Sequence, residues 1–222
     1  MSFCKECITI STHEGTPEGK LETIGGIECY VATPTVDYPK DKVVLYLSDV
    51  FGLSSVNTKL LADDFARNGF KTIAPDLVAN DPVPLDALAT GFDIHAWLNN
   101  GHSQAEIRPV IDKVIAALKA SGVTTFAATG YCLGGRYVFD LGIDNVIKVG
   151  ATSHPSSISS PVDFETYVAK STVPLLINSC TFDELFPLEA QAKADEVLRV
   201  SSPDTSASIS RGVPMGLLFV GI

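Results

Sequence analysis

Apolar residues in this chain gather in short runs, separated by longer segments with helical periodicity. The run at residues 42–48 is nearly continuous, which is typical of a strand buried on both faces of a parallel sheet. Further short runs predict strands at residues 27–32, 70–74, 124–129, 147–152 and 173–178. Helical spacing of apolar residues predicts helices at residues 55–68, 103–120 and 188–199, and another helix after residue 132.

The alternation of predicted strands and helices indicates parallel βαβ units. It predicts an α/β fold with a doubly wound, mostly parallel sheet and helices on both faces. We expect a single domain over residues 1–222, with residues 1–9 loose. The ligand site of such a sheet lies beyond the carboxyl ends of its strands. Four predicted loops lie at that edge, at residues 49–54, 130–135, 153–156 and 180–187.

Residues 77–102 contain four breakers of regular structure, Pro82, Pro84, Gly91 and Gly101. We therefore predict that this segment is irregular. A stretch of this length inside a compact domain is usually functional, so we expect it to form a lid or a pocket wall.

The composition supports a sizeable core and argues against several classes of partner. Of the 222 residues, 45% are hydrophobic and 19% are charged, a balance that disordered chains do not have. The formal net charge is −10 and no dense Lys/Arg cluster occurs, so neither nucleic acid nor an anionic membrane surface is an expected partner. No apolar run approaches the roughly 18 residues that a membrane-spanning helix requires. We expect a small-molecule substrate, and a monomer or weak homodimer.

The cysteines and the first residues indicate a reducing, cytoplasmic location. Five cysteines, an odd number spread over the whole chain, do not resemble a disulfide framework. Residues 1–7 lack the basic and apolar regions of a secretory signal. Cys4 and Cys7 have the spacing of metal ligands, but a four-ligand site needs a second such pair and the sequence has none. No metal is expected.

The turn at residues 130–135, Gly-Tyr-Cys-Leu-Gly-Gly, carries the main candidate for catalysis. A strand, Gly-x-nucleophile-x-Gly and a helix form the nucleophile elbow of α/β-hydrolases, in which a strained backbone lifts the nucleophile above the sheet. Residues two before and two after the nucleophile crowd each other, and Gly130 and Gly134 meet that demand. Free N–H groups and the dipole at a helix start also stabilise a thiolate. We predict that Cys132 is the nucleophile; the alternative is a buried cysteine in an ordinary strand–helix turn.

Asp183 is the candidate acid that orients a catalytic histidine. It lies just beyond the predicted strand at residues 173–178, where α/β-hydrolases carry this residue. The neighbouring Glu184 is a rival for the role, and a solvated loop carboxylate is the remaining alternative.

Asp49 ends the predicted strand at residues 42–48 and is the candidate that controls ionisation of the Cys132 thiol. The alternative is a carboxylate that caps a loop or a helix. The backbone N–H groups of Val50 and Leu133 are the expected oxyanion donors, because this fold draws them from the loop after that strand and from the residue after the nucleophile.

Four motifs resemble the dienelactone hydrolase family, most closely its fungal-type members. They lie at residues 13–17, 49–52, 130–135 and 153–156, and the resemblance runs from about residue 10 to about residue 214. It implies an α/β-hydrolase fold and a Cys-Asp-His hydrolase that opens lactones or cleaves related small esters through an acyl-enzyme, without a metal or organic cofactor. By position, Cys132 matches the family nucleophile and Asp183 the triad acid. Asp49 falls where bacterial members carry a glutamate that controls the resting thiol.

The histidine of that triad is missing from the sequence. Family members carry it in a His-Gly-Phe segment near the C-terminus, whereas no histidine occurs in residues 184–222. The tail Met-Gly-Leu-Leu-Phe-Val-Gly-Ile at residues 215–222 can be encoded by a DNA string that gives His-Gly-Phe-Ala-Val-Arg-Gly-Asp when it is read one base earlier. We therefore interpret the tail as atypical, the product of a one-base frameshift after Pro214. Loss of the base predicts an impaired enzyme.

The four histidines of the sequence have other predicted roles. His154 is expected to line the pocket or to make a structural hydrogen bond, and substitution for the missing base is its alternative role. His95 and Trp97 are candidate pocket-wall residues, with packing as the alternative for Trp97. His13 and His102 are expected at the surface or as caps.

Two functions from different classes follow from these residues. The first is a cysteine hydrolase of small lactones or esters, which the elbow and Asp183 favour. The second is a non-catalytic α/β-hydrolase-fold protein that binds a small ligand or partner, which the histidine-free tail favours.

Overall fold

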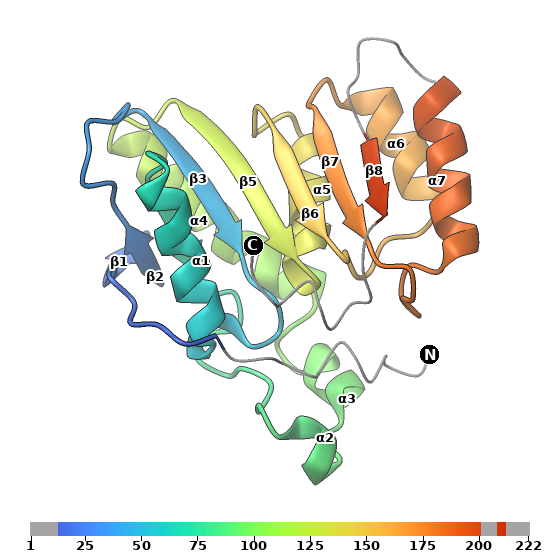
Figure 1. Cartoon of the computed structure of the whole chain (residues 1–222), viewed down its shortest axis with the longest axis horizontal. Coiled ribbons are helices and arrows are strands. Elements are labelled where there is room, and N and C mark those ends of the chain that lie inside the picture. The colour runs from blue at the N-terminus through green and yellow to red at the C-terminus, as the bar shows by residue number, and fades with distance from the viewer. Residues whose placement is uncertain (1–12, 201–207, 212–222) are drawn as a thin grey trace.

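The computed structural model describes residues 13–200 and 208–211 of the chain (Figure 1). The expectations for loose residues 1–9, for Cys4 and Cys7 and for the atypical tail lie outside the described residues. The strands are β1 (Lys20–Ile24), β2 (Ile27–Ala32), β3 (Lys42–Leu47), β4 (Thr72–Pro75), β5 (Thr125–Tyr131), β6 (Gly150–Ser153), β7 (Leu175–Ser179) and β8 (Ser208–Arg211). They form one sheet in the order β1-β2-β4-β3-β5-β6-β7-β8.

Pairing is parallel from β4 through β3, β5, β6 and β7 to β8, and β2 pairs antiparallel with both β1 and β4. The helices are α1 (Val56–Arg67), α2 (Ala87–Thr90), α3 (Ile94–Asn99), α4 (Gln104–Ala120), α5 (Leu133–Ile143), α6 (Val162–Lys170) and α7 (Leu188–Val200), with a 3-10 turn at Gly52–Ser54. In Figure 1, α1 lies in front of the sheet, whereas α4 and α5 lie behind it. The predicted doubly wound, mostly parallel α/β sheet is confirmed.

The core strands follow the predicted pattern because their side chains are buried on both sides of the sheet. All residues of β3 after Lys42 are buried, as are all four residues of β4. The predicted start and stop of α4 are also confirmed. Ser103 donates hydrogen bonds from its N–H and its hydroxyl to Glu106, and Gly122, with φ +101°, follows the helix end. The edge strands β1 and β8 were not predicted, since their short, polar sequences carry no apolar run.

The expectation that residues 77–102 are irregular is wrong in part, because α2 and α3 lie within them. Helices of four and six residues are too short to show a helical period in the sequence. Asp93 caps α3 by accepting a hydrogen bond from Ala96 N–H at 2.9 Å. Ile94 and Trp97 of α3 join the hydrophobic core, so packing rather than periodicity stabilises this helix.

None of the helices in residues 13–200 has both the length and the apolar character needed to cross a membrane.

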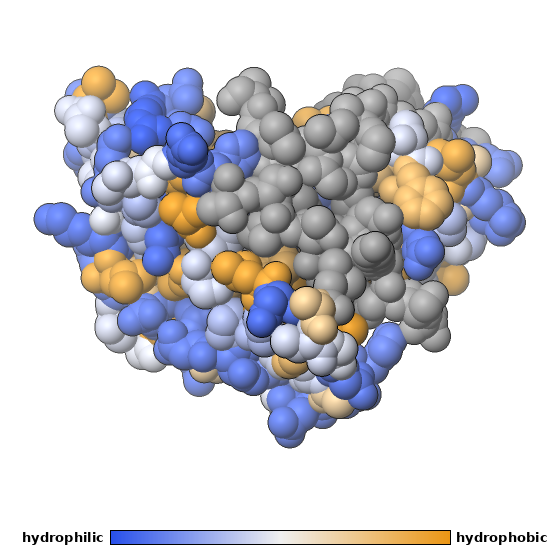
Figure 2. Space-filling model, turned by 60° about the horizontal axis from the view of Figure 1, so that its bottom comes forward, coloured by the Kyte–Doolittle hydropathy of each residue, from blue (hydrophilic) through white to orange (hydrophobic). Residues whose placement is uncertain are grey.

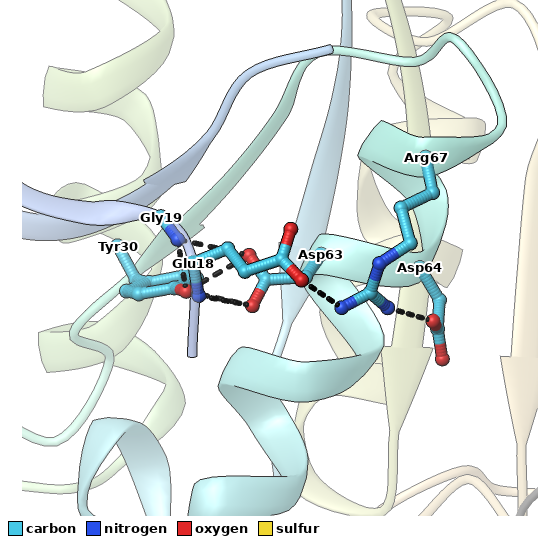
Figure 3. A network of polar contacts seen from close by, with 6 residues as sticks. All are labelled: Glu18, Gly19, Tyr30, Asp63, Asp64 and Arg67. Carbon is cyan, nitrogen blue, oxygen red and sulfur yellow. Dashed lines mark hydrogen bonds and ion pairs between the residues drawn. The ribbon is translucent and has the colours of Figure 1, made fainter. Parts of the chain in front are cut away.

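A buried carboxylate fastens the segment before β1 to α1 (Figure 3). Asp63, on α1 and 2% exposed, accepts hydrogen bonds from the Tyr30 hydroxyl at 2.8 and 2.9 Å. It also accepts from the Glu18 N–H at 2.8 Å and the Gly19 N–H at 3.1 Å. Burial and the hydrogen bond to Asp63 hold the pKa of Tyr30 above its ordinary range, so its hydroxyl remains a donor. The exposed pair between Arg67 and Glu18 lies at the rim of this network.

Replacing Asp63 with alanine is expected to lower the free energy of unfolding by about 2–4 kcal/mol, because three donors lose a charged acceptor in a buried site. Asp64→Ala is the matched control. Asp64 is the next residue on the same helix, but its ion pair with Arg67 is exposed, so its loss should cost less than about 1 kcal/mol. Urea denaturation followed by far-UV circular dichroism measures both. Equal costs for the two variants would contradict the assignment of Asp63 as a buried fastening point.

Candidate functional site

The turn between β5 and α5 has the geometry of a nucleophile elbow. Cys132 is the only residue between the two elements, and its backbone is strained at φ +48° and ψ −110°. Its N–H donates to the Ser153 carbonyl at 3.2 Å, and its carbonyl accepts from the Ser156 N–H at 3.0 Å. The loop after β6 therefore holds the nucleophile turn from one side, through the backbone alone.

Glycines allow the helix to approach the strands at this turn, as their spacing predicts. A Cβ atom on Gly130 would lie 2.5 Å from the Gly134 carbonyl oxygen. A Cβ on Gly134 would overlap the Leu47 carbonyl oxygen of β3, and one on Gly135 would overlap the Thr152 hydroxyl. The Leu47 backbone of β3 and the Gly134 backbone of α5 cannot move aside without breaking the sheet or the helix. The N-terminus of α5 is consequently fixed directly behind Cys132.

Asp49 lies level with Cys132 on the neighbouring strand. Leu47 of β3 pairs with Gly130 of β5, and Asp49 and Cys132 each follow two residues later. The carboxylate is buried, and its Oδ1 accepts a hydrogen bond from the Phe51 N–H at 2.9 Å. Burial, with a smaller contribution from negative charge on Cys132, raises the pKa of Asp49 to about 7. Asp49 therefore changes its charge near neutral pH beside the thiol, while also capping its own loop.

Asp183 lies in the loop after β7 and is also buried, with 5% of its surface exposed. Its Oδ1 accepts hydrogen bonds from the Leu185 N–H at 2.8 Å and the Phe186 N–H at 3.1 Å. Its Oδ2 has no hydrogen-bond partner among the residues that the structure describes. Burial raises the pKa of Asp183, and the two backbone donors oppose this shift. One oxygen is thus fixed by the loop, and the other remains for a further donor.

A glutamine that the sequence did not point to holds the Asp183 loop. Gln191 of α7 is fully buried, and its Nε2 donates to the Cys180 carbonyl at 2.9 Å and to the Phe186 carbonyl at 2.8 Å. These two carbonyls lie on either side of Asp183 along the chain. An internal glutamine on an amphipathic helix has no sequence signal that separates it from a surface one, so only the structure reveals this role.

His154 follows β6 directly and is 1% exposed. Its backbone is strained at φ +40°, and its N–H donates to the Asn178 carbonyl of β7 at 2.9 Å. Charge on His154 lowers the pKa values of Asp49 and Asp183, and negative charge on Cys132 raises them. All four residues follow the carboxyl ends of neighbouring strands of the sheet.

The two oxyanion candidates follow neighbouring strands at equivalent positions in the sequence. Val50 comes three residues after Leu47, and Leu133, the first residue of α5, comes three residues after Gly130, with which Leu47 pairs. Both residues are buried.

The remaining candidates lie elsewhere. His95 is exposed on α3. Trp97 packs in the hydrophobic core, where its ring stacks on His102 at 3.8 Å and its Nε1 donates to the Asp81 carbonyl at 2.8 Å. These contacts favour packing over a pocket-wall role for Trp97. The surface position expected for His102 is wrong, since the residue is buried. Its Nδ1 lies 2.9 Å from the Trp97 carbonyl oxygen in the last turn of α3, which agrees with the capping alternative.

A groove of about 490 Å³ begins beside Asp49 and follows α1. One wall is the segment of residues 13–18, which includes His13, and the floor includes Tyr46 and Tyr131, whose rings stack at 5.1 Å. Figure 2 turns the carboxyl edge of the sheet toward the viewer, and hydrophobic residues of the described part form small groups there among hydrophilic ones. In volume the groove is within the range of small-molecule sites.

Adding a methyl group at Gly134 is expected to destabilise the fold by more than about 3 kcal/mol, because the new Cβ would overlap the backbone of β3. Gly69→Ala is the matched control. Gly69 has open space around its Cβ position but a φ of +89°, so alanine there should cost about 1–2 kcal/mol. Urea denaturation compares the variants. Failure of the Gly134 variant to fold agrees with the expectation, whereas a cost no greater than that of the control contradicts it.

Asp49 predicts a specific dependence of stability on pH. A carboxyl group whose pKa is raised in the folded state costs no stability while it is neutral, and the cost grows as pH rises from about 4 to about 7. The Asp49→Asn variant should therefore gain about 3 kcal/mol relative to the wild type between pH 5 and pH 8. Urea denaturation at both pH values measures this gain. Asp37→Asn, at an exposed position, is the control, and its stability should change with pH as that of the wild type does. If the stability of Asp49→Asn also changed with pH as that of the wild type does, the expectation for Asp49 would be contradicted.

The fold agrees with comparisons to known proteins. Residues 27–213 match the model of the Dienelactone hydrolase family. Hydrolase pyvD of Aspergillus violaceofuscus is 36% identical over 197 residues, which cover 86% of this chain and 76% of that protein. Dienlactone hydrolase 1 of Gibberella moniliformis is 30% identical over 198 residues, which cover 86% of this chain and 74% of that protein. A crystal structure from Klebsiella pneumoniae, described as a candidate dienelactone hydrolase, has the same fold, with a TM-score of 0.66, 21% identity and coverage of 85% of this chain and 80% of that one. The chain therefore belongs to the dienelactone hydrolase family.

Proposed function

We propose that this protein is a cysteine hydrolase that opens small lactones or cleaves related small esters, with Cys132 as its nucleophile. The observation that carries the proposal is the elbow itself. Cys132 stands alone between β5 and α5 with a strained backbone, and glycines on both sides let the helix N-terminus approach. A nucleophile in this position attacks a carbonyl that lies above the sheet edge.

In the proposed reaction the Cys132 thiolate adds to the carbonyl carbon, and the carbonyl oxygen turns toward the Val50 and Leu133 N–H groups. The alcohol then leaves; in a lactone it stays attached to the acyl chain as a free hydroxyl. Water releases the acyl group from sulfur. The equivalent positions of Val50 and Leu133 on paired strands support their role as donors.

The two carboxylates have different proposed roles. Asp183 stabilises and orients a protonated imidazole through its Oδ2, which the loop leaves available. Asp49 controls ionisation of the thiol, because a carboxylate that is negative above about pH 7 opposes a second negative charge on Cys132. Each carboxylate also accepts backbone N–H donors of its own loop, so the capping alternative considered for Asp49 is compatible with this role.

The groove beside Asp49 supports a small-molecule substrate. Its lining includes four carboxylates, Glu14, Glu18, Asp49 and Asp64, whereas its arginine, Arg67, is already paired with acidic neighbours. A site with this charge balance favours an uncharged or cationic substrate over an anionic one.

The absence of a histidine from residues 184–222 supports an impaired enzyme and also the second candidate function. In that second reading, the fold binds a small ligand or partner without catalysis. A frameshift after Pro214 would account for the loss of the base in a lineage of hydrolases. We therefore propose that full activity belongs to the protein encoded in the frame that gives His-Gly-Phe after Pro214.

A chromogenic ester assay separates these functions. We expect slow turnover by the 222-residue chain, and a rate higher by about 100-fold or more when residues 215–222 are replaced by His-Gly-Phe-Ala-Val-Arg-Gly-Asp, because a base is restored. Cys132→Ala should abolish the activity of both forms. Cys29→Ala, at another buried cysteine, is the matched control and should retain it. If both forms show only background turnover that Cys132→Ala does not change, the hydrolase proposal is contradicted and the non-catalytic function is favoured.

A further inference from the structure

The row of side chains along the carboxyl edge of the sheet has an order that matters for catalysis. The strands β3, β5, β6 and β7 are direct neighbours in that sequence. Beyond the carboxyl ends of these strands come, in the same order, Asp49, Cys132, His154 and Asp183; Cys132 and His154 follow their strands directly, whereas Asp49 comes two residues after β3 and Asp183 four residues after β7. In strand order, His154 thus comes between the proposed nucleophile and the proposed acid, which is the order of nucleophile, base and orienting acid in hydrolytic triads.

Strand register places Cys132 and His154 level with each other. Tyr131 of β5 pairs with Ser153 of β6, so each of the two candidates is the first residue after a paired position. Two backbone hydrogen bonds connect their turns, Cys132 N–H to the Ser153 carbonyl and Ser156 N–H to the Cys132 carbonyl. The separation of the two turns is thus fixed by the sheet and not by flexible side chains.

The backbone of His154, like that of Cys132, has a positive φ. Both residues have positive φ values, +40° and +48°, which cost an L-residue other than Gly or Asn about 1–2 kcal/mol. Backbone strain of this kind collects at functional sites, where the surroundings hold a side chain in one place. The hydrogen bond from His154 N–H to the Asn178 carbonyl of β7 anchors the strained residue on its other side.

Two buried carboxylates follow other strand ends of the same row. Asp49 and Asp183 are both buried, and positive charge on His154 lowers the pKa of each carboxyl group. A positive charge formed on this imidazole during proton transfer would therefore have acidic groups as counterions at the same edge of the sheet.

We propose that His154 is the base that takes the thiol proton of Cys132 in this chain. The inference rests on the proposed hydrolase function, because it fills the vacant role in the same site. The proton of the S–H bond moves to an imidazole nitrogen as the S–C bond forms, and the imidazolium returns it to the departing alkoxide when the C–O bond breaks. In the second half, the imidazole takes a proton from water as the hydroxide adds to the thioester, and the sulfur recovers that proton on leaving.

The test is the rate at which 4-nitrophenyl acetate acylates Cys132, measured by the burst of nitrophenolate. His154→Gly and His154→Asn suit the backbone, since both residues tolerate positive φ. We expect each variant to slow acylation by about 100-fold or more, and free imidazole to restore a large part of the rate in His154→Gly. Ser157→Gly is the matched control, because it changes an exposed residue of the same loop, with φ +58°, and should alter the rate less than twofold.

The outcomes separate this inference from the proposed function. A purely structural His154 would make the variants less stable, which thermal unfolding reports, but imidazole would not rescue them. Normal acylation by His154→Gly, or no rescue, overturns the assignment of the base while the hydrolase function stands. If Cys132→Ala shows the same burst as the unchanged chain, or if the chain carrying the His-Gly-Phe tail is inactive, the proposed function itself fails.

Discussion

The contact between the backbone of α5 and the backbones of β3 and β5 is the constraint on which the site depends. No side chain separates them, since a Cβ on Gly134 would overlap the Leu47 carbonyl and a Cβ on Gly130 would meet the Gly134 carbonyl. This approach forces the connection into a single strained residue, Cys132. It also makes Cys132 the residue that directly precedes α5, and free N–H groups at a helix start stabilise negative charge.

The same edge of the sheet carries an electrostatic cost that the loops partly offset. Asp49 and Asp183 are both buried, and burial alone would keep them neutral. Each loop aims backbone N–H groups at one carboxylate oxygen, which stabilises the charged form without satisfying the whole group. The carboxylates are therefore held in place while they remain responsive to charge on Cys132 and His154. Gln191 serves this arrangement indirectly, because it fixes the carbonyls on both sides of Asp183.

Most of the fold and the elbow could be predicted from the sequence because their signals are local. The apolar run of β3 and the glycines at positions 130 and 134 express burial and close approach within a few residues. Trp97 and His102 could not be placed in this way, because their stacking depends on α3, a helix whose stability comes from the core. Which strand ends lie side by side also escapes the sequence, since β3 is inserted between β4 and β5 in the sheet. His154 could be named as a candidate, but its place between Cys132 and Asp183 follows only from that strand order.

In the proposed site, the position of Asp183 would allow the acid to act with either of two bases. Its loop follows β7, which pairs with β6 on one side and with β8 on the other. His154 follows β6, whereas the family's His-Gly-Phe segment would come after β8 in the sequence. The Oδ2 atom has no hydrogen-bond partner in the described part of the chain, so it could accept a hydrogen bond from either histidine. Under the proposal, a chain without the second histidine keeps the acid, the nucleophile and the buried His154 at the same edge of the sheet. Its residual chemistry should depend on the spacing that the paired strands impose and not on the tail.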